Sequence, residues 1–256
     1  MIIIKTPEQI EGIRRAARAA RSVLDFIAPF VKPGVSTKEL DERIYEYITE
    51  TLGGEPTFLG YRGFPASACI SINEEVVHGI PSPERVIKPG DVVKIDVGVT
   101  LDGFVGDVAD TFLVEPASEL AKRLVKATRE AFWKAVKVIK EGARLGDIGH
   151  AVQSHVARYG FRPVRELAGH GVGVKLHEDP LVPNYGRPGE GLRLRAGMTL
   201  AIEPMISAGT ARVRTLPDGW TVVTADGSLA AHYEHDVLVK PTGAEVLSLL
   251  SSSFPL

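Results

Sequence analysis

The segment that most restricts the fold is an Asp-Gly pair between two apolar runs, in residues 94–111, KIDVGVTLDGFVGDVADT. Asp-Gly flanked by alternating apolar residues predicts a β-hairpin with a two-residue turn. With such a turn, Asp96 and Asp107 fall on one face as diagonal neighbours within side-chain reach. Ile95 and Val97 then take the opposite face, because successive side chains of a strand alternate.

Two carboxylates that lie so close repel each other unless a proton or a cation lies between them. The pair is therefore a candidate acid/base dyad or metal site. The alternative is an exposed strand face that carries solvated aspartates. One residue more or less in the loop would move the two side chains to opposite faces, so the hypothesis needs evidence from elsewhere in the chain.

Composition narrows the class of protein. The chain has 256 residues, enough for one large domain or two small ones, and its net charge of −2 predicts no nucleic-acid groove and no specific nucleic-acid partner. A single cysteine, Cys69, excludes an internal disulfide and fits a reducing compartment. No apolar run is long enough to cross a bilayer. We therefore expect a cytoplasmic protein with no membrane partner, and a monomer.

Capping signals predict the helices. Residues 6–9, TPEQ, form a capping box with proline at the first helical position, and helical spacing continues until Pro29. Residues 36–39 repeat the device. A longer helix is expected over roughly 118–140, with Leu120 among its core residues, and a shorter one over about 146–159. Strands are expected within 68–78, 91–114, 164–176, 198–207 and 220–240.

Two helices followed by strands occur twice, which suggests an internal repeat. GDVVKID, residues 90–96, aligns with GMTLAIE, residues 197–203. Each has a turn glycine, an apolar strand and an acid six residues after the glycine. Asp107 and Glu234 are the matching acids on the returning strands, with a longer intervening loop in the second half. The matched positions are those where a charge is expensive to bury.

Seven polar residues stand at strand positions or tight glycine turns: His78, Asp96, Asp107, His170, His177, Glu203 and Glu234. Four carboxylates gathered in one α/β domain repel each other without cations. Together with one imidazole they suit two divalent ions about 3.5–4 Å apart. Oxygen-rich ligation with one nitrogen favours Mn, Fe(II) or Co over a structural zinc, and the sequence does not choose among the three.

Seven segments then carry a family resemblance: VVHGIP (76–81), KIDVG (94–98), GFVGDVADTF (103–112), AGHGVG (168–173), LHEDP (176–180), AIEPM (201–205) and HYEHD (232–236). The set resembles the motifs of the type I methionine aminopeptidases, in order and over nearly the whole chain. The resemblance implies the pita-bread fold, an α/β (α+β) pseudo-twofold repeat of helices packed on a curved antiparallel β-sheet. We expect one catalytic domain over 1–256, with half-repeats at roughly 1–116 and 117–256.

The same resemblance implies roles for the polar residues. It implies that two divalent ions are ligated by Asp96, Asp107, His170, Glu203 and Glu234. Asp107 and Glu234 would bridge the ions, and a bridging hydroxide would attack the scissile carbonyl. Glu203 would shuttle the proton to the leaving amine. His177 would donate to the carbonyl oxygen of the peptide and His78 would contact its nitrogen.

The resemblance also implies a substrate and a pocket. The substrates would be the N-termini of nascent proteins, from which the initiator methionine is removed when the second residue is small. The methionine side chain would lie among Phe58, Tyr61, Phe64, Cys69, Leu176 and Trp220. Aromatic walls and a thiol suit a polarizable thioether.

Several readings stay open on the sequence. A proline-specific aminopeptidase or creatinase has the same fold, as does a peptide-binding module that has lost its ligands. Position 232 is usually glutamine in the family, and here His232 is expected on the face of Glu234, beside the ligands. The first helix carries four arginines, at 14, 15, 18 and 21, which fit either a solvated face or a transient contact with the ribosome.

Overall fold

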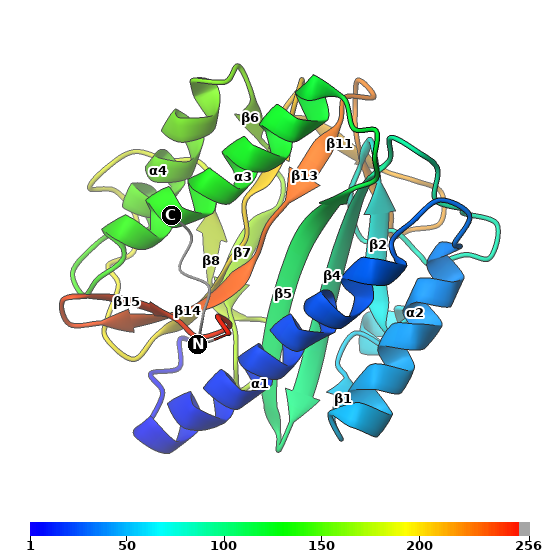
Figure 1. Cartoon of the computed structure of the whole chain (residues 1–256). Coiled ribbons are helices and arrows are strands. Elements are labelled where there is room, and N and C mark those ends of the chain that lie inside the picture. Colours follow the sequence, from blue (N-terminus) through cyan, green and yellow to red (C-terminus); the bar gives the residue numbers. More distant parts are fainter. Residues whose placement is uncertain (251–256) are drawn as a thin grey trace.

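The computed structural model describes residues 1–250. The last six residues of the expected second half-repeat lie outside the described residues. Short helical turns occur at Ala28–Phe30, Tyr47–Thr51 and Tyr61–Gly63. The longer elements form two groups, each with two helices packed on antiparallel strands (Figure 1).

The first group is built on the predicted hairpin. Its elements are α1 (Pro7–Ile27), α2 (Thr37–Glu46), β1 (Glu55–Pro56), β2 (Ala68–Ile72), β4 (Val92–Leu101) and β5 (Phe104–Leu113). Strand β4 is central, with β1, β2 and β5 paired to it. Asp96 lies opposite Ala109 and Gly98 opposite Asp107, so the predicted register is confirmed. Asp102 in the turn has a φ of 51°, a conformation that Asp tolerates in two-residue hairpin turns.

The second group repeats the arrangement with a wider sheet. Its helices are α3 (Glu119–Val138) and α4 (Leu145–Ala157), and its five-stranded sheet has the order β15-β14-β9-β7-β8. These strands are β7 (Ala168–Gly171), β8 (Glu178–Pro183), β9 (Thr199–Ile202), β14 (His235–Lys240) and β15 (Gly243–Val246). Two small sheets add β3 (Glu75–Val77), β6 (Arg162–Pro163), β10 (Met205–Ser207), β11 (Val213–Thr215), β12 (Val222–Thr224) and β13 (Ala230–His232).

Each group encloses its own apolar core. In the first, α1 packs against β4 and β5, and the side chains of Ile95 and Val97 are fully buried beneath it. In the second, α3 and α4 pack against each other and over the strands, with Leu200 and Ile202 in the core. The turn glycines that align in the two halves, Gly90 and Gly197, both adopt positive φ, at 87° and 92°. The repeat found in the sequence is therefore a repeat of backbone conformation.

The two groups join at the returning strands. Ala109 of β5 and Glu234, between β13 and β14, form an isolated antiparallel bridge in which the N–H of Glu234 donates to the carbonyl of Ala109 at 2.9 Å. The reciprocal bond is 3.3 Å. This bridge places the acid of the second half next to the acids of the first.

Some local expectations were wrong. Leu120 is 43% exposed: it lies in the first turn of α3, and the buried positions of the helix begin with Ala121. Five strands fall outside the expected ranges: β1, β6, β8, β11 and β15. Four of them contain Pro or Gly, which weaken the strand pattern, and β11 is only three residues long. Within residues 1–250, no helix is both long and apolar enough to cross a bilayer.

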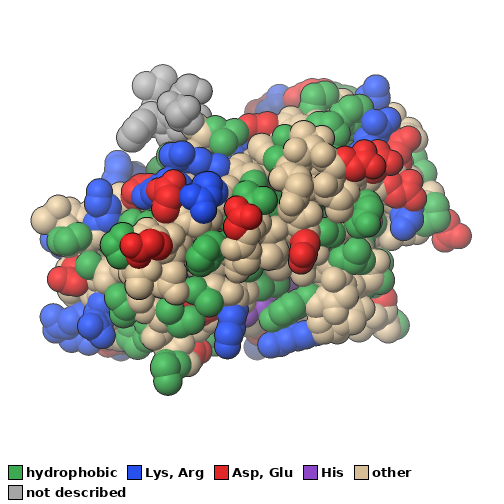
Figure 2. Space-filling model, turned by 90° about the horizontal axis from the view of Figure 1, so that it is seen from below, with side chains coloured by type: hydrophobic (Ala, Val, Ile, Leu, Met, Phe, Trp, Pro, Cys, Tyr) green, Lys and Arg blue, Asp and Glu red, His purple; other side chains and the backbone are tan. Residues whose placement is uncertain are grey.

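The arginines of α1 do not all project into solvent. Arg14 forms ion pairs with Glu245 and Glu11, and Arg21 pairs with Asp110 and Asp25. The side chains of both arginines are about one-fifth exposed, at 20% and 21%. The face seen in Figure 2 intersperses Lys and Arg with Asp and Glu, without an extended area of one charge.

Candidate metal centre and substrate pocket

The five expected ligands come from both halves and meet at the junction. Asp96 and Asp107 lie on the paired strands β4 and β5, and His170 lies on β7. Glu203 follows the end of β9 directly, and Glu234 follows β13. All five side chains are buried, with no more than 9% of any residue exposed.

Their ligand atoms form two overlapping sets. One contains Asp96, Glu203, His232 and Glu234, and the other contains Asp107, His170 and Glu234; within each set the atoms lie within 4.8 Å of one another. Glu234 belongs to both sets, which is the arrangement that a bridging carboxylate requires. Asp107 belongs to one set, so its bridging role rests on the resemblance alone. The residues that the sequence motifs indicate therefore lie close together in the fold.

The carboxylates of this cluster lie in a buried environment, where a negative charge is unfavourable. Burial, and then the charges of neighbouring carboxylates, hold the pKa of Asp96 and Glu234 well above their usual range. Oδ1 of Asp96, Oδ1 of Asp107 and both side-chain oxygens of Glu234 are buried without a hydrogen-bond partner. Buried polar atoms are nearly always paired, so these oxygens call for a partner that the polypeptide does not supply. Divalent cations fit this donor set of carboxylates and imidazole.

His170 has the orientation of a metal ligand. Its Nδ1 lies 2.8 Å from the carbonyl oxygen of Gly171, which only accepts, so Nδ1 carries a hydrogen and donates it. Nε2 then faces Asp107 at 3.4 Å and Glu203 at 3.5 Å. Burial opposes a charge on the ring, but the hydrogen bond to Asp107 and the charges of Glu203 and Asp107 raise the pKa of His170 to about 9. A cation bound at Nε2 would replace that proton.

The sequence assigned no role to one further buried acid of this region. Asp236 is fully buried, and its Oδ2 accepts the backbone N–H of Asp107 at 2.9 Å. Burial, and then the charge of Asp107, hold the pKa of Asp236 well above its usual range. Alternation through residues 232–236 of the sequence places it on the face of His232 and Glu234, which was the available signal.

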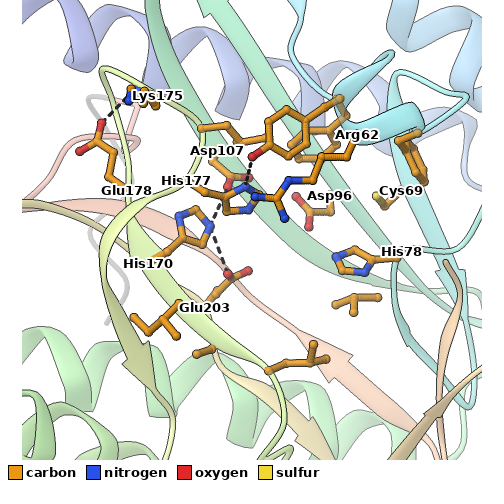
Figure 3. A pocket seen from close by; sticks show the side chains of 18 of the residues that line it. Arg62, Cys69, His78, Asp96, Asp107, His170, Lys175, His177, Glu178 and Glu203 are labelled. Atoms are coloured by element: carbon orange, nitrogen blue, oxygen red, sulfur yellow. Dashed lines mark hydrogen bonds and ion pairs between the residues drawn. The ribbon is translucent and has the colours of Figure 1, made fainter. Parts of the chain in front are cut away.

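A cavity of about 860 Å³ opens above the ligands. Asp96, Asp107, His170 and Glu203 line it on one side (Figure 3). The expected methionine-pocket residues all line it as well: Phe58, Tyr61, Phe64, Cys69, Leu176 and Trp220. The rings of Phe64 and Trp220 pack edge to face at 5.1 Å. The pocket is therefore an apolar recess whose floor carries the polar cluster.

The two expected substrate histidines flank the cluster. The Nδ1 of His177 lies 2.9 Å from the hydroxyl of Tyr61, and its ring packs against that of His170 at 4.3 Å. His78 lies against Trp220, with 6.3 Å between ring centroids, and has a φ of 61°. Positive φ is uncommon for a residue other than glycine, and such conformations gather at functional sites. Burial lowers the pKa of both histidines, so each is a neutral donor or acceptor near pH 7.

Cys69 is a pocket wall rather than a nucleophile. Burial, followed by the charges of Asp96 and Asp107, holds the pKa of its thiol well above the ordinary value. A thiolate is the reactive form, so this environment suppresses reactivity. Cys69 is therefore a small buried side chain that lines the pocket.

Similarity to known proteins identifies the family of this chain. The model of metallopeptidase family M24 matches residues 11–241. The chain belongs to metallopeptidase family M24. It is 49% identical over 249 residues to a methionine aminopeptidase of Clostridium acetobutylicum, covering 97% of this chain and 99% of the relative. The crystal structure of the methionine aminopeptidase of Thermotoga maritima superposes with a TM-score of 0.95 at 48% identity, covering 98% and 100% of the two chains.

A less similar solved structure shares the fold. A prolidase of Pyrococcus furiosus has a TM-score of 0.78 at 24% identity, and the match covers 97% of this chain and 66% of the prolidase. The resemblance drawn from the seven motifs is thus confirmed, and so is the pita-bread fold. Membership of family M24 makes the chain a metallopeptidase, and with the clustered acids and histidines it supports divalent-metal binding.

Proposed function

We propose that the protein is a methionine aminopeptidase that removes the initiator methionine from new proteins in a metal-dependent reaction. The observation that carries the proposal is the position of the acid and imidazole cluster at the floor of an apolar, aromatic pocket. A peptide that enters side chain first brings its terminal amine and first carbonyl to the cluster. The relatives named methionine aminopeptidase match this chain end to end, which supports the same substrate class.

We assign the metal ligands to the five residues that the motifs indicate: Asp96, Asp107, His170, Glu203 and Glu234. Two divalent ions fit the two overlapping sets, and Mn, Fe(II) and Co suit the donors. When bound, such ions lower the pKa of water and polarise the scissile carbonyl. The carboxylates hold the centre in place, and His170 presents Nε2 because Nδ1 is committed to Gly171.

The protein's own side chains handle orientation and protons. We assign the hydrogen of the contact between Nδ1 of His177 and the hydroxyl of Tyr61 to the hydroxyl. Nε2 of His177 then carries its own hydrogen and points a donor at the carbonyl oxygen of the peptide. His78 faces the peptide nitrogen across the pocket. Glu203 lies at the cavity floor, with an oxygen available to pass a proton to the leaving amine.

The pocket selects the first side chain by shape and polarizability. Methionine is unbranched and its thioether packs well against aromatic edges, which Phe64 and Trp220 provide. The thiol of Cys69 completes the wall without a charge. We further propose that the enzyme works as a monomer in the cytoplasm on nascent chains with a small second residue, and that it meets the ribosome only transiently.

The test is methionine release by chelator-stripped protein titrated with Mn(II), Fe(II) or Co(II). We expect Met-Ala-Ser to be cleaved only with metal, and Met-Lys-Ser much more slowly. Ala-Pro is the control substrate. Cleavage of the proline peptide alone would move the chain to the proline-specific members of the fold, and metal binding without turnover of any peptide would favour a binding module.

A further inference from the structure

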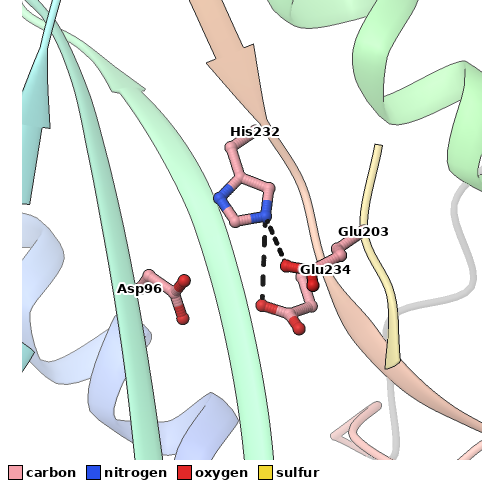
Figure 4. Close-up of side chains that lie close together, drawn as sticks. All are labelled: Asp96, Glu203, His232 and Glu234. Carbon is pink, nitrogen blue, oxygen red and sulfur yellow. Dashed lines mark hydrogen bonds and ion pairs between the residues drawn. The ribbon is translucent and has the colours of Figure 1, made fainter. Parts of the chain in front are cut away.

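The metal cluster contains a second buried imidazole, that of His232, whose surroundings differ from those of His170. His232 is 1% exposed at the end of β13 (Figure 4). Its Nε2 lies 3.0 Å from Oε2 of Glu203 and 4.0 Å from Oε1 of Glu234. Only the first distance is that of a hydrogen bond. The imidazole therefore contacts one ligand carboxylate directly.

The other ring nitrogen distinguishes two roles for this histidine. A histidine that binds metal through one nitrogen donates its other N–H to an acceptor, as His170 does to the carbonyl of Gly171. The Nδ1 of His232 is buried and has no partner. If Nε2 bound a cation, the hydrogen would sit on Nδ1 with no acceptor to receive it, and a buried N–H group without an acceptor is unfavourable.

The opposite tautomer avoids that loss. With the hydrogen on Nε2, His232 donates to Glu203, and Nδ1 keeps only an unused lone pair. Orphaned acceptors are tolerated more often than orphaned N–H groups. The bond occupies Oε2 of Glu203, while Oε1 lies 3.5 Å from Nε2 of His170. The two oxygens of Glu203 are thus held by different partners.

We propose that His232 is a positioning residue whose Nε2–H holds Glu203 by Oε2, so that Oε1 is presented to the cation and the reacting peptide. This role adds a residue to the proposed metal-dependent function and rests on that function. Glu203 needs such a restraint because it lies just beyond the end of β9, outside the strand ladder that fixes Asp96. It follows that any donor of the same reach can replace the imidazole. Glutamine qualifies, since its amide nitrogen is as many bonds from Cα as Nε2 of histidine.

The experiment compares wild type, His232→Gln and His232→Leu as full chains. Calorimetry measures Mn(II) affinity of the stripped proteins, and kcat and KM are measured on Met-Ala-Ser. We expect His232→Gln to stay within about threefold of wild type in both. We expect His232→Leu to lose about 10–100-fold in Mn(II) affinity or in kcat, as losing a hydrogen-bond partner of a ligand does, with KM little changed.

The matched control is His155→Leu, which removes a largely buried imidazole of α4 that contacts Glu130, away from the cluster. It should lower the thermal midpoint without changing Mn(II) affinity or kcat. A His232→Gln variant as defective as His232→Leu, with an altered Co(II) absorption spectrum, would make His232 a ligand and overturn the proposal. So would a His232→Leu variant that loses only thermal stability. Failure of the proposed function is separate, because wild type would then release no methionine while the Mn(II) titrations still compare the variants.

Discussion

The two halves of the molecule supply acids to the same centre in different ways. The first half delivers Asp96 and Asp107 from one hairpin, on adjacent strands joined by a two-residue turn. The second half delivers Glu203 and Glu234 from strands separated by a long excursion through β10–β13. The first pair is placed by the backbone ladder, whereas the second lies just outside the strands that lead to it.

The difference explains the residue types. A short aspartate on a paired strand has few conformations, so its position follows from the register. A glutamate beyond the strand end has an extra rotatable bond and needs partners. Glu203 has His232 on its carboxylate and Asn184 on its backbone carbonyl, at 3.1 Å. Glu203 therefore depends on neighbouring side chains. Glu234 is held through its backbone by the bridge to Ala109, and the shorter acids of the first half are held by the sheet.

The largest expected effect comes from removing one acid from each half. Asp107→Asn and Glu234→Gln should each lower kcat by about 1000-fold, because each removes a ligand charge from a centre that supplies several kcal/mol of transition-state stabilisation. Methionine release from Met-Ala-Ser at saturating Mn(II) measures the loss.

Asp102→Asn is the control for this pair. Asp102 lies in the turn of the same hairpin and is exposed, and Asn tolerates its positive φ of 51°. Its activity should equal that of wild type. If Glu234→Gln kept its activity while Asp107→Asn lost it, the shared role of Glu234 would be wrong. The reverse result would mean that the two halves do not contribute equally to the centre.

The same contrast separates what the sequence predicted from what it did not. The hairpin register was predictable because an Asp-Gly turn leaves one pairing that buries the apolar face. Helix α1 was predictable because its cap is local: Thr6 accepts from the backbone N–H of Gln9, and the side chain of Gln9 returns to Thr6. The acids of the second half emerged through alignment with the first half and through the family motifs. Long-range pairing fixes their places, and one sequence carries little information about it.

The sequence did not predict which individual side chains contact each other. The bond between His232 and Glu203 spans 29 positions, and that between Asp236 and Asp107 spans 129. The first contact lies within the second half, and the second depends on how the halves meet at Ala109 and Glu234. The prediction of Leu120 as a core residue was wrong for a related reason. Helical periodicity shows which face of a helix is buried, but not how far along the helix the neighbouring elements cover that face. The roles of the five proposed ligands stay predictions until metal is bound and measured.

The second prediction tests whether the halves unfold together. Ile95→Ala in the first core and Leu200→Ala in the second each remove a fully buried aliphatic side chain, and should each cost about 2–5 kcal/mol. We propose that the chain is one domain, so each variant should lower the midpoint of a single transition. Far-ultraviolet circular dichroism and tryptophan fluorescence should give coincident curves.

Leu120→Ala is the matched control, because it deletes the same atoms from a leucine that is 43% exposed. It should change the free energy of unfolding by less than about 0.5 kcal/mol. Two separated transitions in either core variant would mean that the halves are independent domains.

A third, smaller effect concerns Asp236, which links the halves through the N–H of Asp107. Its pKa is raised in the folded, metal-free protein, mainly by burial. Above the unfolded pKa of about 4 the folded state therefore binds more protons than the unfolded state, so this group destabilises the protein increasingly as pH rises toward the folded pKa. Asp236→Asn does not titrate. Its thermal midpoint relative to wild type should rise from about pH 5 to about pH 8, by about 2–4 °C for each kcal/mol.

The measurement is thermal melting of both stripped proteins across that pH range. Saturating Mn(II) is the control, since bound cations compensate the buried carboxylates and should shrink the difference between the proteins. A midpoint difference that is constant with pH in the metal-free state would show that Asp236 ionises normally.

The smallest effect should come from Tyr61→Phe, which removes one hydroxyl from the first half at its contact with His177 of the second. The hydroxyl lies 2.9 Å from Nδ1 of His177. Without it, Nδ1 can carry the hydrogen instead, and Nε2 then no longer always points a donor at the substrate carbonyl. One neutral hydrogen bond contributes about 0.5–1.5 kcal/mol, so kcat should fall by about 2–10-fold. KM should not change, because the ring that lines the pocket remains.

Tyr61→Leu, which also removes the ring, should raise KM as well. A Tyr61→Phe variant with unchanged kcat would mean that His177 is oriented by the second half alone, through its contact with the ring of His170.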